Sequence, residues 1–246
     1  MDVTLSQADG RYVLRLRRHL AHPPARVWRA LTTPEELRHW FPADLDGALE
    51  PGGVLTFTFR EGEAPPSGGT VVALEPGHLF EFTWQDETLR WELAPDGGGT
   101  LLTFTHTFDD GPGAAGFAAG WVACLGALDA ALSGTTTSAG WSAELHDRFL
   151  DTFGLREGVL ETTPAGWRVR FVRQLTRPAD VVEKVLADMA STPGRTPLPD
   201  ADWQFTPGPG GARAVLTVTG SDTSADQAYA DARRALDELA AQLRRR

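Results

Sequence analysis

His106 is the polar residue best placed for chemistry, because it interrupts an alternating apolar segment, Phe104-Thr105-His106-Thr107-Phe108. Alternate residues of a strand face the same side, so the imidazole shares its face with two phenylalanines. It could anchor the carbonyl or hydroxyl group of a ligand, or move a proton. It could equally satisfy its own hydrogen bonds against a neighbouring hydroxyl or backbone group, and the sequence leaves both interpretations open.

Other residue types lack the spacing that catalysis or metal binding requires. Cys124 is the single cysteine, and its helical spacing from Trp121 and Leu128 is typical of a small buried apolar residue rather than a nucleophile. The sequence contains no His-Glu-x-x-His motif and no serine in a nucleophile elbow. We therefore assign no catalytic residue and expect no metal or cofactor. If the protein were an enzyme, His106 would be its general acid or base.

Composition and charge are typical of a globular protein that avoids polyanions. The chain has 246 residues, of which 41% are hydrophobic and 23% charged, and its formal net charge is −10. Such a charge repels nucleic acids and anionic lipids unless a basic patch is segregated, and none is visible. No run approaches the roughly 18 to 20 continuous apolar residues of a membrane-spanning helix, and residues 1–6 show no targeting signal. We expect a cytoplasmic protein with no nucleic-acid partner and no membrane insertion.

The elements that must position His106 are predicted from periodicity. Alternation and turn residues predict strands over 11–20, 53–60, 69–75, 78–85, 88–94 and 100–108, which we expect to form a six-stranded antiparallel sheet. Helices are expected to begin near Pro23 and Pro34, since proline is tolerated in a first turn, and Thr33 with Glu36 reads as a capping box. A long apolar helix over 113–133 would close the sheet.

The inward faces of these strands are unusually aromatic. Such a surface is either the lining of an apolar pocket or a solid core, and alternation alone does not distinguish the two. We predict a ligand-binding pocket lined by Trp40, Phe41, Phe57, Phe59, Phe82, Trp84, Trp91, Phe104, His106 and Trp121.

The chain contains an internal repeat. Residues 11–31 align with 166–186 at an offset of 155, so that Arg18 recurs as Arg173, and the hairpin that begins at Trp91 recurs at Trp203. The second copy is abridged, because 60 positions separate Leu31 from Trp91 but only 17 separate Leu186 from Trp203.

Three segments follow from the repeat. We expect a first domain over 1–133, a linker and docking helix over 134–155, and the abridged copy over 156–246. The docking helix would present an apolar stripe of Trp141, Leu145, Phe149 and Phe153. The abridged copy, with a strand over 167–175 and a hairpin over 202–219, would have three strands and an unpaired edge. We expect it to continue or cover the first sheet, or to pair with itself in a homodimer.

Several segments between residues 11 and 133 resemble one known family. They are Val27-Trp28-Arg29-Ala30-Leu31-Thr32, Trp40-Phe41, Pro51-Gly52-Gly53 and Leu79-Phe80-Glu81-Phe82-Thr83-Trp84. In this order they are similar to the activator of Hsp90 ATPase homologue 1-like family of the START-like superfamily, also called Bet v 1-like. The resemblance implies an α+β helix-grip fold, in which a curved antiparallel sheet wraps a long C-terminal helix. The second copy resembles the family only at its ends.

The leading functional hypothesis is a cytosolic binding protein for a small hydrophobic molecule, held between the sheet and the long helix. Two alternatives remain open at this point. The resemblance also implies a cyclase/dehydrase-type enzyme using the same cavity, or a chaperone-associated protein-interaction module.

Overall fold

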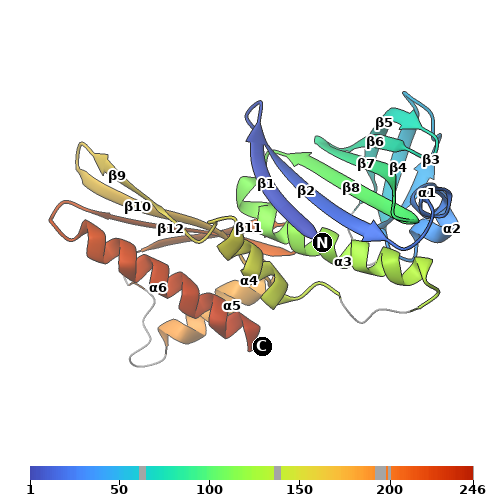
Figure 1. The fold of residues 1–246 in the computed structure, drawn as a ribbon. Helices are drawn as coiled ribbons and strands as arrows, with labels where there is room; N and C mark the ends of the chain where they lie inside the picture. The colour runs from blue at the N-terminus through green and yellow to red at the C-terminus, as the bar shows by residue number, and fades with distance from the viewer. Residues whose placement is uncertain (61–64, 136–139, 192–197, 199–200, 246) are drawn as a thin grey trace. The chain divides into compact units, whose positions relative to one another are not determined.

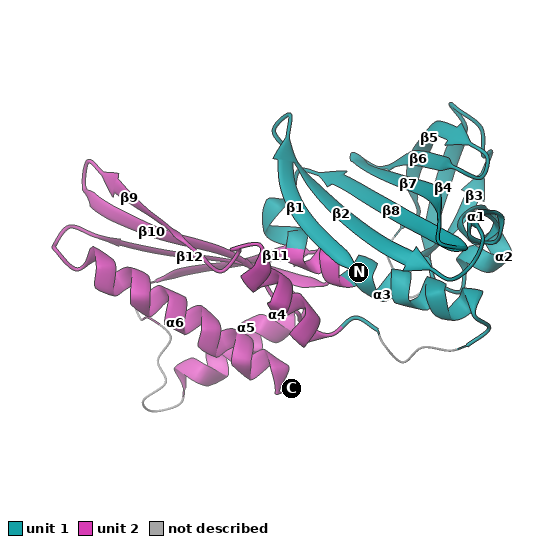
Figure 2. Cartoon of the chain, in the orientation of Figure 1, with its two compact units in different colours: residues 1–114, 120–141 teal, residues 115–119, 142–246 magenta. Residues whose placement is uncertain are grey.

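The computed structural model describes residues 1–60, 65–135, 140–191, 198 and 201–245. The chain divides into two compact units, shown in different colours in Figure 2. Unit 1 comprises residues 1–114 and 120–141, and unit 2 comprises residues 115–119 and 142–246. Residues 136–139 of the predicted linker lie outside the described residues, as do the prolines of the connector before Trp203.

Unit 1 is built on one antiparallel sheet and the helix α3, which runs along it (Figure 1). Its elements are β1 (Asp2–Ala8), β2 (Arg11–Leu20), α1 (Pro24–Thr32), α2 (Pro34–Leu37), β3 (Ala43–Gly47), β4 (Val54–Phe59), β5 (Ser67–Glu75), β6 (Leu79–Trp84), β7 (Glu87–Asp96), β8 (Gly99–Phe108) and most of α3 (Ala114–Leu132).

The sheet has eight strands in the order β1-β2-β8-β7-β6-β5-β4-β3, so the prediction of six was wrong. The two missed strands, β1 and β3, form its two edges. An edge strand buries little of its surface, so β1 shows no fully buried position. The segment that forms β3 contains two aspartates and a glycine, which are depleted in strands, and this masked its pairing with β4.

The short helices pack at one end of the sheet without the predicted capping box. The Thr33 side chain makes no capping hydrogen bond to α2. Glu36 instead accepts hydrogen bonds from the guanidinium groups of Arg26 and Arg29 on α1. The carboxylate therefore ties α2 to α1 rather than satisfying its own helix terminus.

Helix α3 corrects a further expectation. The segment Gly111–Leu132 is long and apolar enough to cross a membrane, judged by length and composition alone, with a mean hydropathy of 1.5. Sequence inspection overlooked it because glycine and alanine dilute its larger residues. Its Leu125 and Leu128 are fully buried, as expected for the core helix of a sheet protein.

Unit 2 has its own antiparallel sheet with helices against it. Its elements are α4 (Ala143–Thr152), β9 (Val159–Thr163), β10 (Gly166–Gln174), α5 (Ala179–Ala190), β11 (Asp202–Gly208), β12 (Gly211–Gly220) and α6 (Ala225–Arg244). The strand order is β11-β12-β10-β9, so β9 is a fourth strand that the sequence analysis missed. Among the described residues the two sheets are separate, so of the three expected arrangements the second sheet does not continue the first, and the other two remain predictions.

The registers of the two sheets support the predicted repeat. In unit 1, Trp91 lies opposite Phe104, and Phe104 lies opposite Leu16. In unit 2, Trp203 lies opposite Leu216, and Leu216 opposite Phe171. Residue numbers in unit 2 exceed those of their counterparts by 155 for Leu16 and Phe171, and by 112 for Phe104 and Leu216 and for Trp91 and Trp203. One alignment of the two sheets therefore matches the pairing on both sides of β8 and β12. In sequence, segments 101–105 and 215–219 look alike at an offset of 114, so the register in the structure differs from that alignment by two residues.

The repeat also extends further than the sequence alignment showed. The pairing registers of hairpins β1–β2 and β9–β10 correspond at the same offset of 155, since Ala8 pairs with Arg11 as Thr163 pairs with Gly166. Helices α1 and α5 both follow a proline at the N-cap, and their first residues again differ by 155. The shared framework is therefore strand, strand, helix, strand, strand, helix. Unit 1 adds α2 and strands β3 to β6 within it.

Helix α4 buries a different face from the one predicted. Trp141 precedes the helix and is 39% exposed, whereas His146, Phe149 and Leu150 are buried. Phe149 stacks on Phe153 with ring centroids 5.3 Å apart. A histidine replaces Trp141 on the buried face, because the helix begins only at Ala143. The docking role remains a prediction.

Candidate functional site

The aromatic residues predicted to line a pocket meet on the inner face of the unit 1 sheet. They come from β4, β6, β7, β8 and α3, and from the two residues 40–41 that follow α2. Their ring centroids lie 4.0 Å apart for Trp91 and Phe104, 4.5 Å for Phe57 and Trp84, and 4.5 Å for Phe104 and Trp121. At such distances the rings are in direct contact.

Phe41 lies at the centre of this cluster. Its ring contacts Trp84 at 5.5 Å and Trp121 at 6.0 Å between centroids, so it touches both the sheet and α3. Its neighbour Trp40 packs edge-on against Trp91 and donates its indole N–H to the carbonyl oxygen of Ala30, 2.9 Å away. The two residues, which we call the plug, thus fill the space between the sheet and α3.

Little space remains among these side chains. A cavity of about 10 Å³ lies between Phe41 and its neighbours, which is room for roughly one water molecule. It is lined by Leu31, Leu37, Trp40, Phe41, Leu45, Phe80, Phe82 and Trp91. Here the rings fill the space between the inner face of the sheet and α3, which we call the aromatic cup. The ligand-sized pocket predicted from sequence is not open at this position.

The predicted residues separate into a buried group and a rim. Eight are buried: Trp40, Phe41, Phe57, Phe82, Trp91, Phe104, His106 and Trp121. Phe59 is 39% exposed at the end of β4, and Trp84 is half-buried with its indole N–H donating to the Ser67 hydroxyl at 2.7 Å. Phe59 and Trp84 are the last residues of β4 and β6. At the end of a strand a side chain that points inward is not necessarily buried, so these two lie at the rim.

His106 is buried and held by two side-chain partners. The Trp121 indole N–H donates to Nδ1 of the imidazole at 3.2 Å, and Nε2 lies 2.8 Å from Oε2 of Glu87. An indole nitrogen can only donate, so Nδ1 must be the acceptor, and a neutral ring then carries its proton on Nε2. That proton is donated to the Glu87 carboxylate. The contacts thus define the tautomer of the histidine.

Glu87 is a candidate residue that the sequence analysis missed. It is the first residue of β7 and shares the inward register of Leu89 and Trp91, but it precedes the strand predicted over 88–94. Its side chain is 34% exposed, whereas His106 is 1% exposed, so the pair joins the protein surface to the core. An acidic residue in an apolar register was the signal available in the sequence.

Cys124 lies on α3, one turn from Trp121, and is not suited to nucleophilic chemistry. Burial raises the pKa of its thiol to about 11, so the group stays protonated at neutral pH. No group of three or more potential metal ligands is found within the part of the chain that the structure describes.

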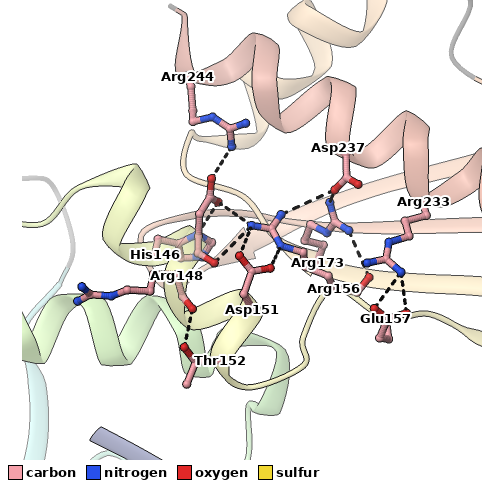
Figure 3. Close-up of polar contacts among 11 residues, drawn as sticks. His146, Arg148, Asp151, Thr152, Arg156, Glu157, Arg173, Arg233, Asp237 and Arg244 are labelled. Carbon is pink, nitrogen blue, oxygen red and sulfur yellow. Dashed lines mark hydrogen bonds and ion pairs between the residues drawn. The ribbon is translucent and has the colours of Figure 1, made fainter. Parts of the chain in front are cut away.

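Unit 2 contains a second polar cluster, which Figure 3 shows in close-up. Arg173 faces inward between Phe171 and Leu175 and is 1% exposed. Its guanidinium group donates to Oδ1 of Asp237 on α6 at 2.5 Å. Like His106, it is a polar residue in the apolar register of its strand, and this signal was overlooked.

Ion pairs connect most of the charged side chains in this cluster. Arg156 pairs with Asp151 on α4, and Arg244 of α6 pairs with Asp147 of α4 at 2.5 Å. A compensated network of this kind joins α4 to β10 and α6. Its chemistry is that of a structural ion-pair network, since each of Arg156, Arg173 and Arg244 has an aspartate partner.

The fold and the aromatic inner face define unit 1 as an α+β helix-grip protein. Residues 21–133 match the sequence profile of the family described as "Activator of Hsp90 ATPase homolog 1-like protein". The match covers less than half of the chain, and unit 1 is similar to that family, as the resemblance implied.

Solved structures of other proteins share the fold. A conserved protein of unknown function from Enterococcus faecalis, EF2215, is 19% identical, with a TM-score of 0.51, over 62% of this chain and 90% of its own. CalU16 from Micromonospora echinospora is 18% identical, with a TM-score of 0.48, over 62% of this chain and 94% of its own. At these identities the likeness concerns the fold alone. None of the proteins with a curated description matches this sequence.

Proposed function

We propose that unit 1 binds a small hydrophobic molecule in the aromatic cup between its sheet and α3. The observation that supports this is the continuous aromatic inner face with a hydrogen-bonded histidine, His106, buried among the rings. A few placed polar groups within an apolar lining are typical of small-molecule sites. The ligand would take the place of an aromatic ring that now fills the cup, and would contact the remaining rings.

The plug formed by Trp40 and Phe41 is the element that would open. It follows α2, a helix of only four residues, and is held by few polar contacts. Arg60 donates to the carbonyl oxygen of Phe41, and the Trp40 indole N–H holds the carbonyl of Ala30. The backbone N–H groups of Trp40 and Phe41 also donate to the carbonyl oxygen of Leu37, at 3.0 and 2.8 Å. Burial of the two rings adds to this, at roughly 25 cal/mol per Å² of apolar surface. A hydrophobic ligand would restore that burial after displacing Phe41.

The first experiment is native mass spectrometry of the purified protein before and after organic extraction. A discrete added mass that extraction removes would support the proposal and give the ligand class. A second arm uses Phe41→Ala, which should open an apolar cavity and bind benzene-sized aromatics, raising the melting temperature. Val54→Ala, at a position 70% exposed on β4, is the control and should show no such shift. Bare protein together with no thermal shift in Phe41→Ala would overturn the proposal.

One observation favours the alternative of a cyclase/dehydrase-type enzyme. Glu87 supplies the second polar group that proton transfer through His106 requires. If a ligand identified by extraction is chemically altered on incubation with wild-type protein but not with His106→Phe, the enzyme is favoured over the carrier. A chaperone-associated role has only the family name in its favour, and we do not propose it.

A further inference from the structure

We propose that the ligand of this cup carries a hydroxyl or N–H group, which donates a hydrogen bond to Nδ1 of His106 in place of Trp121. This rests on the proposed function, and it names the chemical class of the ligand. A hydrophobic alcohol, phenol or amine-type N–H compound would fit the site, whereas an ether or ketone of the same shape would not.

The first step is the direction of the hydrogen bonds at His106. Glu87 accepts the Nε2 proton, and Trp121 donates to Nδ1. As long as the Glu87 carboxylate holds the Nε2 proton, Nδ1 keeps its lone pair and remains an acceptor. Glu87 is thus a positioning residue, because it decides which ring nitrogen faces the interior of the cup.

The second step is the place of Trp121. Its ring contacts Phe41, Trp91 and Phe104, with centroids 6.0, 5.7 and 4.5 Å away, so it belongs to the same ring cluster as the plug. A ligand that replaces the Phe41 ring would therefore lie beside Trp121. Its donor can take over Nδ1 when the indole turns away.

The third step is the cost of the wrong ligand. His106 is 1% exposed, so water does not readily replace a lost partner at Nδ1. A ligand without a donor would either leave this buried acceptor unsatisfied or have to bind without moving Trp121. Sites built around a buried hydrogen bond discriminate strongly against analogues that lack the matching group.

The tautomer can be tested without any ligand. Nitrogen-15 NMR of the imidazole rings distinguishes a protonated from an unprotonated ring nitrogen, and His106→Phe identifies the His106 signals among the six histidines. In the wild type we expect Nε2 protonated and Nδ1 unprotonated. Glu87→Leu removes the acceptor of the Nε2 proton but leaves the Trp121 donor at Nδ1, so we expect a mixture of tautomers only in the double variant Glu87→Leu with Trp121→Phe. A wild-type ring protonated on Nδ1 would overturn the inference.

The ligand class is tested with two probes of matched shape, 2-naphthol and 2-methoxynaphthalene, by isothermal titration calorimetry. Wild-type protein should bind 2-naphthol about tenfold more tightly, the effect expected for one buried hydrogen bond. His106→Phe should bind both equally, provided its melting curve shows that it is folded. Equal binding by the wild type, or a preference retained in His106→Phe, would overturn this inference alone. Failure of both probes to bind, with no co-purified ligand, would overturn the proposed function as well.

Discussion

The two units share one framework but complete it differently. In each, a strand arginine in the inward register pairs with an aspartate of the long helix: Arg18 with Asp129 in unit 1 and Arg173 with Asp237 in unit 2, both at 2.5 Å. Unit 1 inserts the segment from α2 to β6 after its first helix, and this segment carries six of the nine aromatic residues predicted to line the cup. The comparison teaches that the cup is a property of the insert, not of the shared framework.

Unit 2 closes its shorter sheet with small side chains and helices. Ala212 and Ala214 on β12 lie in the core with Phe171, where α5 contributes Val182 and Val185. Position 218 holds valine where the shared alignment places His106 in unit 1. Unit 2 therefore retains the framework but has neither the aromatic cup nor its histidine.

The largest expected difference between the units concerns the matched tryptophans. Trp91 is fully buried among rings, so Trp91→Ala should lower the free energy of unfolding by about 4 kcal/mol, whereas half-buried Trp203→Ala should cost about 2 kcal/mol. Urea denaturation measures both, with hydrogen exchange assigning each loss to its own unit. Equal losses of free energy would mean that Trp91 and Trp203 are packed equally well.

The second effect separates the two arginine–aspartate pairs. Arg173 is 1% exposed and burial lowers the pKa of its guanidinium, so Asp237→Ala would strand a buried charge and cost about 3 kcal/mol. Arg18 is 23% exposed and can be hydrated, so Asp129→Ala should cost only about 1 kcal/mol.

Protection of the β10 and β2 amides by hydrogen–deuterium exchange reports each loss locally. The double variant Arg173→Met with Asp237→Ala should regain most of the stability, because it removes the stranded charge. If the double variant is no more stable than Asp237→Ala, the buried-charge explanation is wrong.

A smaller change in stability is expected in acid, because each unit has a partly buried carboxylate with a lowered pKa. Burial raises the pKa of Asp147, but the neighbouring His146 and the charges of Arg244 and Arg156 outweigh it, so the pKa lies below its usual value. In unit 1, hydrogen bonds from Arg26 and Arg29 likewise outweigh burial and lower the pKa of Glu36.

A carboxyl whose pKa is lower in the folded than in the unfolded state stabilises the fold above its unfolded value, near pH 4, and this contribution is lost as the pH falls through the folded pKa. Asp147→Asn should therefore flatten the acid dependence of unit 2 stability, and Glu36→Gln that of unit 1. Unit-resolved hydrogen exchange between pH 5 and pH 3 measures both. A steeper dependence in either variant would contradict the assigned sign.

The smallest expected effect is a labelling rate. Cys124 is the single cysteine of the chain and belongs to unit 1, and its buried thiol has a pKa of about 11, so alkylation at pH 8 should be slow. Asp129→Ala should speed the labelling severalfold by loosening α3, whereas Asp237→Ala should leave it unchanged. A rise in Asp237→Ala equal to that in Asp129→Ala would show that the units open together.

Much of the fold could be predicted because it is written in local periodicity. Alternation located six strands of unit 1 and three of unit 2, while the edge strands β1, β3 and β9 escaped, since their side chains are too exposed or polar to alternate clearly. For the site, His106 stood out as a polar residue in an apolar register. Glu87 and Arg173 are also polar residues in an apolar register, but they were not predicted as site residues, because their partners lie on other elements.

The sequence by itself determined the order of most elements, the similarity between the two halves and the aromatic character of the inner face, because side-chain alternation and spacing along the chain encode them directly. Only the tertiary structure decided that the rings meet around Phe41, that β9 completes a separate sheet, and that Trp121 and Glu87 hold His106 in one tautomer. The physical reason is that alternation says which face a side chain takes. Whether two faces touch, and which side chain donates a hydrogen bond to which, depends on distances between segments far apart in the chain.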